Sequence, residues 1–163
     1  MKLGSMNVPL SGMPFEAAME YLASIGVEAV EIGCGGFPGK AHCDPEVLLN
    51  DSGKLEEFTA VLARYGLSIS ALSCHGNPVH PNKAVAEQAD REFRSAVLLA
   101  EKLEVGVVNT FSGCPGDCPE SRYPNWVTCP WPDDFGEILE YQWNEVLIPY
   151  WKDMAVFLNR HHV

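Results

Sequence analysis

Leu67-Ser-Ile-Ser-Ala-Leu-Ser-Cys-His-Gly-Asn-Pro-Val-His-Pro81 joins an apolar segment to a loop that carries two histidines and an asparagine. An apolar strand that leads into a polar loop is typical of parallel α/β proteins, which bind their ligands at the carboxyl ends of their strands. The segment also belongs to a repeat, since Gly26, Gly66 and Gly106 each precede a strand-like segment at intervals of 40 residues. The chain is therefore predicted to be a series of βα units.

The apolar periodicity on either side of this segment predicts alternating strands and helices. Strands are expected at residues 2–7, 27–32, from 67 onward and 107–111, and helices at 15–25, 52–65, 83–103 and 135–159. Ser52 is the expected N-cap of the second helix, and Pro149 predicts a kink or break in the last one. Gly33-Cys-Gly-Gly36 matches no phosphate-binding fingerprint, and it is expected to be a flexible turn after the second strand.

The segment at 112–134 is expected to be a long loop, because it holds five prolines and two tryptophans. Its aromatic and cysteine content favours an ordered loop over a disordered one. With 163 residues, of which 47% are hydrophobic, the chain is long enough for a single α/β domain with a core over residues 1–163.

The formal net charge of -11 argues against a nucleic-acid partner, because such binding depends on Lys and Arg that neutralise phosphates. The acidic residues of the predicted helices, Glu92 among them, are interpreted as solvated faces. No apolar run is long enough to span a membrane, and the short polar start does not resemble a signal peptide. We therefore expect no membrane partner, a cytoplasmic location and reduced cysteines.

Three motifs resemble the xylose isomerase-like (β/α)8 superfamily, specifically its sugar phosphate isomerase/epimerase group. They are Gly26-Val-Glu-Ala-Val-Glu-Ile32, Ser70-Ala-Leu-Ser-Cys-His-Gly-Asn-Pro78 and Phe111-Ser-Gly-Cys-Pro-Gly116. The resemblance covers the whole chain but only the first half of such a barrel. It implies the first four βα units of a TIM barrel, an open half-barrel that stops before the fifth strand.

The resemblance implies a sugar or sugar phosphate isomerase or epimerase that shifts a proton between adjacent carbons through an enediolate. Members hold a divalent metal, here Mn, Mg, Co or Zn, with carboxylates and a histidine from strands five to eight, and two of the glutamates move the proton. Those strands are absent, so no catalytic or metal-ligating residue is assigned here. This half is expected to bind the sugar or keto-sugar substrate and to be inactive alone.

The candidate substrate-binding residues lie at the predicted strand ends and in the long loop. They are His75, His80, Asn7, Glu31, Asn109, Trp126 and Trp131. A neutral imidazole both donates and accepts, so His75 suits a sugar hydroxyl, a carbonyl or a phosphate, and His80 sits between two prolines in the same loop.

Each of these candidates also has a competing interpretation. His75 could bond its own loop or ligate a metal, and His80 could face solvent. Glu31 could bridge strands as a buried, hydrogen-bonded carboxylate. The two tryptophans could cover the apolar face of a sugar ring or anchor the loop by burial.

Two other functions remain open at this stage. An endonuclease IV-like nuclease shares the fold, although the acidic charge and the strand end Asn109-Thr-Phe-Ser112 oppose it. A non-catalytic α/β domain is the other alternative, and an open half-barrel would then form a homo-oligomer through its exposed edges. Zinc binding by Cys114, Cys118 and Cys129 is disfavoured, because the spacing lacks a second close pair.

Overall fold

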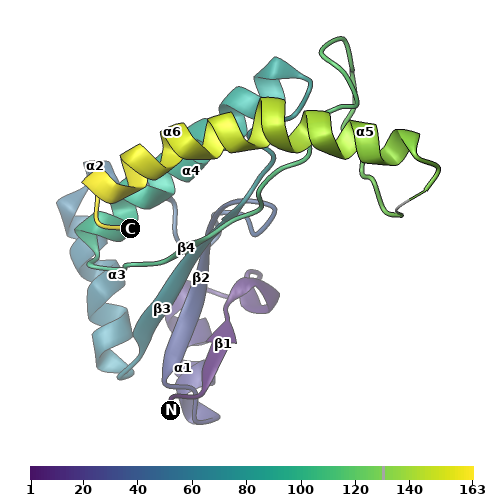
Figure 1. Cartoon of the computed structure of the whole chain (residues 1–163). Helices are drawn as coiled ribbons and strands as arrows, with labels where there is room; N and C mark the ends of the chain where they lie inside the picture. Colours follow the sequence, from purple (N-terminus) through teal and green to yellow (C-terminus); the bar gives the residue numbers. More distant parts are fainter. Residues whose placement is uncertain (130) are drawn as a thin grey trace.

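The computed structural model describes residues 1–129 and 131–163, and it contains a parallel four-stranded sheet (Figure 1). The strands are β1 (Gly4–Met6), β2 (Ala29–Gly36), β3 (Ser68–His75) and β4 (Val108–Asn109). They pair in the order β1-β2-β3-β4, and every neighbouring pair is parallel. The predicted α/β fold of four βα units is thus confirmed. The sheet does not close into a barrel, because β1 and β4 lie at its two edges.

Helices connect consecutive strands, as parallel pairing requires. They are η1 (Val8–Leu10), α1 (Phe15–Ser24), α2 (Pro45–Asn50), α3 (Ser52–Arg64) and α4 (Lys83–Lys102), and after β4 come α5 (Asp134–Glu140), the π-helix η2 (Tyr141–Leu147) and α6 (Ile148–Arg160). Figure 1 shows α6 lying along α4, whereas α5 extends past the end of the sheet. None of these helices is both long and apolar enough to cross a bilayer, considering residues 1–129 and 131–163.

The core lies between the sheet and its helices. Alternate side chains of a strand point to the same face, and Val30, Ile32 and Cys34 of β2 are all fully buried. Leu72 and Cys74 of β3 are buried in the same cluster, which also includes Met19, Leu99 and Met154 from three helices. This packing fixes where β2 and β3 end relative to the helices, and therefore the position of the loops that follow these strands.

The predicted turn at residues 33–36 is wrong, because these residues belong to β2. Gly33, Gly35 and Gly36 pair with Ser73, Cys74 and His75 of β3. A Cβ on Gly35 would lie 2.7 Å from the Cys74 sulfur, and one on Gly36 would lie 2.0 Å from the His75 carbonyl oxygen. These glycines therefore allow the two strands to approach closely. In the sequence alone, the same glycines resemble a turn signal.

Other predicted boundaries also change. Asp51 caps α3, since its side chain accepts from the Lys54 backbone N–H, and Ser52 is the first helical residue. The fourth strand is only two residues long. The helix expected at 135–159 is divided into α5, the π-helix η2 and α6, and Pro149 lies in the first turn of α6, directly after the π-helix. The short helix α2 was not predicted, although Asp44 caps it.

Candidate functional site

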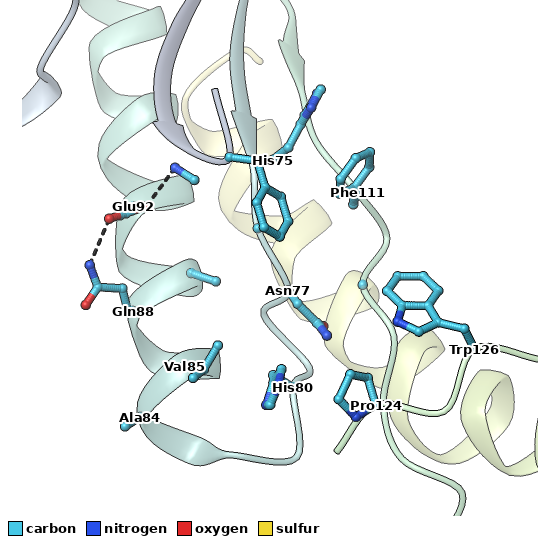
Figure 2. A pocket seen from close by; sticks show the side chains of 15 residues that line it. His75, Asn77, His80, Ala84, Val85, Gln88, Glu92, Phe111, Pro124 and Trp126 are labelled. Carbon is cyan, nitrogen blue, oxygen red and sulfur yellow. Dashed lines mark hydrogen bonds between the residues drawn. The ribbon is translucent and has the colours of Figure 1, made fainter. Parts of the chain in front are cut away.

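A cavity of about 800 Å³ opens at the carboxyl ends of β2, β3 and β4. Figure 2 shows its walls, which come from the loops after these strands and from the first turns of α4. Ligand pockets are typically about 300–1,000 Å³ and mostly apolar, with a few polar groups that fix orientation. The cavity therefore has the size and the place of a ligand site in a parallel α/β protein.

His75 is the last residue of β3 and lies in the cavity wall. Its ring stacks on Phe111, with ring centroids 4.5 Å apart, and its Nε2 lies 3.3 Å from the Ser73 hydroxyl. Phe111 follows β4, and its ring centroid is 6.2 Å from that of Phe37, which follows β2. Three consecutive strand ends thus build one aromatic wall. This supports an orienting role for His75, whose ring is only half-buried.

His80 reaches the same cavity from the loop between β3 and α4. Its Nδ1 accepts a hydrogen bond of 2.9 Å from the backbone N–H of Asn82. A nitrogen that accepts carries no proton, so the ring is the neutral tautomer with hydrogen on Nε2. No described residue accepts from this Nε2. His80 therefore presents a hydrogen-bond donor rather than an acceptor or a positive charge.

Glu92 of α4 is the one charged side chain among the described lining residues. Its Oε2 accepts from the Gly36 backbone N–H at 2.8 Å, and its Oε1 accepts from Gln88 Nε2 at 2.8 Å. Lys40 lies 4.0 Å away. The interpretation of Glu92 as part of a solvated face is therefore wrong. Only the spacing of Gln88 and Glu92, four residues apart on a helix, could have indicated the bond between them.

Asn77, which lies between His75 and His80 in the chain, holds the two neighbouring loops together. Its Nδ2 donates to the Cys114 carbonyl at 2.7 Å, and its Oδ1 accepts from the Cys114 backbone N–H at 3.0 Å. Both bonds cross from the loop after β3 to the loop after β4. Gly113 adopts φ 93° there, and a Cβ would lie 2.9 Å from Asn77 Oδ1. The sequence shows Asn77 inside the motif, but not that its side chain already bonds the loop after β4.

The structure brings only three of the seven predicted substrate-binding residues to this cavity. His75, His80 and Trp126 line it, whereas Asn7, Glu31, Asn109 and Trp131 do not. Glu31 and Asn109 are half-buried on β2 and β4. Trp126 is 63% exposed and Trp131 is 72% exposed, so neither is a buried loop anchor. Trp126 stands at the cavity rim, as Figure 2 shows.

Asn7 is buried away from the cavity, with only 3% of its surface exposed. Its Oδ1 accepts from the Gly33 backbone N–H at 2.9 Å, and its Nδ2 donates to His42 Nδ1, also at 2.9 Å. His42 Nε2 donates in turn to the Met13 carbonyl at 2.8 Å. This chain of bonds ties the end of β1 to β2 and to two loops. His42, which no sequence motif indicated, thus has a structural role.

Four of the six cysteines are buried. The pKa of the Cys34 thiol is raised by its hydrogen bond with Cys74 and by burial, and burial followed by the neighbouring Asp44 raises the pKa of Cys43 to about 12. Burial likewise raises the pKa of Cys114. These thiols are protonated and unreactive at neutral pH.

Residues 1–129 and 131–163 contain no cluster of three or more His, Cys, Asp or Glu side chains that could hold a metal ion. Cys114, Cys118 and Cys129 do not form such a cluster, and neither do the histidines of the cavity with Glu92. Three or more protein ligands are usual in metal sites that proteins build. The donor set of the described chain therefore does not fit a divalent metal by itself.

The chain is similar to a known protein family and to a curated bacterial protein. A family model described as xylose isomerase-like TIM barrel matches residues 19–145. The curated protein YfiH of Bacillus subtilis (strain 168), described as uncharacterized, is 35% identical over 157 residues, which are 95% of this chain and 50% of the relative. The chain thus spans about half the length of this relative.

Proposed function

Because the chain belongs to the xylose isomerase-like TIM barrel family, we propose that it is the substrate-binding half of a sugar or sugar phosphate isomerase or epimerase. The observation that carries this proposal is the cavity at the ends of β2, β3 and β4, where His75 stacks on Phe111 and His80 lines the same space. Such a wall suits the less polar face of a sugar ring, and imidazoles suit its hydroxyl and carbonyl oxygens.

The proposed reaction is a 1,2-proton shift through an enediolate. In it, His80 Nε2–H donates to a substrate oxygen, and His75 holds a second oxygen while its ring stays fixed against Phe111. The aromatic wall excludes water from one side of the ring. Glu92 is bonded to Gly36 and Gln88, which leaves it as a support for the cavity rather than a base. This half thus orients the substrate.

The acid–base groups and the divalent metal are proposed to lie outside this chain. The family resemblance implies Mn, Mg, Co or Zn, but the described residues offer no fitting set of donors. No step is therefore assigned to a metal here. A small-molecule partner is favoured over nucleic acid, because the net charge is -11 and no lysine or arginine is among the described lining residues. We propose no membrane partner.

Solvent exchange tests this proposal directly. The full-length gene product that carries this chain, purified with manganese, magnesium or cobalt, is incubated in D2O with a panel of keto-sugars and their phosphates. We expect deuterium to enter a carbon next to the carbonyl of at least one compound, as seen by proton NMR. Protein treated with a chelator is the control. Absence of exchange across the panel would overturn the proposed function.

A further inference from the structure

The cavity has an unusual charge balance for a site that would bind a sugar phosphate. Of its fifteen described lining residues only Glu92 is charged, and that charge is negative. Lys40, which is not a lining residue, pairs with this Glu92 at 4.0 Å and with Asp44 at 3.9 Å. Phosphate sites normally use arginine, lysine or free backbone N–H groups. The described lining side chains include neither an arginine nor a lysine.

The N-terminus of α4 does not supply a phosphate site either. The first turn of α4 borders the cavity through Ala84 and Val85, and helix N-termini often bind anions. Here Asn82 already occupies those N–H groups: its side chain accepts from Ala84 N at 3.0 Å, and its carbonyl accepts from Val85 N and Ala86 N, both at 3.1 Å. A phosphate at this position would find the capped N–H groups taken.

What the cavity does offer is apolar surface and a donor. Phe37, Phe111 and Trp126 are all exposed and line it, and His80 Nε2–H has no partner among the described residues. A hydroxyl, ring or carbonyl oxygen satisfies that donor, and a ring of C–H groups fits the aromatic faces. An anion in the same place would lose its hydration shell without gaining a cation.

We propose that the part of the substrate held in this cavity is an uncharged polyhydroxylated ring that carries no phosphate or carboxylate. Its less polar face lies against Phe111 and Trp126, and one of its oxygens accepts from His80. The inference rests on the proposed function, which names a sugar or a sugar phosphate as the substrate. Of these two classes, it selects the unphosphorylated sugars.

Equilibrium binding tests the inference without any need for turnover. The full-length gene product is titrated by calorimetry with unphosphorylated ketohexoses, aldohexoses and inositol, with the corresponding phosphate esters and with inorganic phosphate. We expect an unphosphorylated ring to bind at least about tenfold more tightly than its own phosphate ester, and inorganic phosphate not to compete. His80→Ala is expected to weaken this binding about tenfold or more.

A charge added to the cavity gives the matched test. Val85 is 43% exposed and lines the cavity, so Val85→Lys places a cation there at little cost to the fold, and Val156→Lys adds the same charge at a 52% exposed position of α6. We expect Val85→Lys to strengthen phosphate-ester binding about tenfold and Val156→Lys to leave it unchanged.

Three results would overturn the inference: an ester that binds the wild type as tightly as the unphosphorylated ring, no binding by any unphosphorylated compound, or no difference between the two lysine variants. The proposed function fails separately, by absence of C–H exchange in D2O. A protein that exchanges protons but prefers phosphate esters would therefore refute the inference alone.

Discussion

At the scale of single residues, polar side chains near the strand ends divide into those that hold the fold and those that face the cavity. Asn7 and Asn77 use their amide groups for hydrogen bonds to the backbone and to His42, whereas the Nε2–H of His80 has no partner among the described residues. Sequence position does not separate these roles. What separates them is whether each donor and acceptor already has a partner.

Asn7 is expected to be important for stability. Asn7→Ala leaves the buried Gly33 N–H without an acceptor and removes the bond to His42, so we expect a loss of about 1–3 kcal/mol in unfolding free energy. Urea denaturation followed by circular dichroism measures it. Asn144→Ala, at an exposed position whose amide bonds only Glu140, is the control and should change stability by less than about 0.5 kcal/mol. Equal effects would contradict the structural role.

The cysteines give a second test at this scale. Cys118 and Cys129 are exposed, whereas the other four thiols are buried, and burial raises the pKa of Cys43 and Cys114. Ellman's reagent at pH 8 should therefore label two thiols rapidly in the native protein and the remaining four only after unfolding. Mass spectrometry identifies the labelled peptides. Rapid labelling of Cys34 or Cys43 would contradict the burial of these two thiols in the core.

At the scale of elements, one polar cluster joins α6 to α4. The Tyr150 hydroxyl donates to Asp90 at 2.8 Å, and Arg94 binds the other oxygen of Asp90 at 2.8 Å. The Arg94 guanidinium also lies 4.8 Å from the centre of the Phe157 ring. This cluster holds α6 against α4.

Tyr150→Phe should lower stability by about 1–2 kcal/mol at neutral pH, because it removes a hydrogen bond to a carboxylate. Burial, and then the bond to Asp90, raise the pKa of Tyr150 above its usual value of about 10. A raised pKa means that the protonated form is favoured in the folded state. The contribution of the Tyr150 hydroxyl to the unfolding free energy is therefore complete below about pH 10 and is lost as the pH rises above that value.

Denaturation curves between pH 8 and 11 measure this dependence. The wild type should lose stability more steeply above pH 10 than Tyr150→Phe does. Tyr123→Phe, at a 78% exposed position, serves as the control and should follow the wild type. Parallel curves for the wild type and Tyr150→Phe would contradict the assigned contact.

The elements also show where sequence reasoning succeeds. Glycines at 40-residue intervals and helical apolar periodicity gave the βα order, because strand edges and helix stripes follow from local patterning. The same reasoning missed the end of β2, where Gly35 and Gly36 permit contact with Cys74 and His75, since that need is visible only once β3 is beside them. Glu92 was misassigned for the same reason: its partner Gly36 lies 56 residues away.

At the scale of the whole molecule, the sheet has two open edges, β1 and β4. Unpaired strand edges favour association with other strands. We propose that the isolated 163-residue chain forms homo-oligomers through these edges. Size-exclusion chromatography with light scattering should show species larger than a monomer that dissociate on dilution. A compact monomer at all concentrations would contradict this.

We propose that this half of the barrel orients the substrate and does not move its proton. Steady-state kinetics of the full-length gene product, on the substrate identified by deuterium exchange, tests it most directly. His75→Ala removes the proposed substrate contact and the stacking on Phe111, so we predict that KM rises about tenfold or more while kcat changes less than about threefold. The exposed His162→Asn should leave both constants unchanged. A large fall in kcat for His75→Ala at unchanged KM would contradict the account, because it would place His75 in the chemical step.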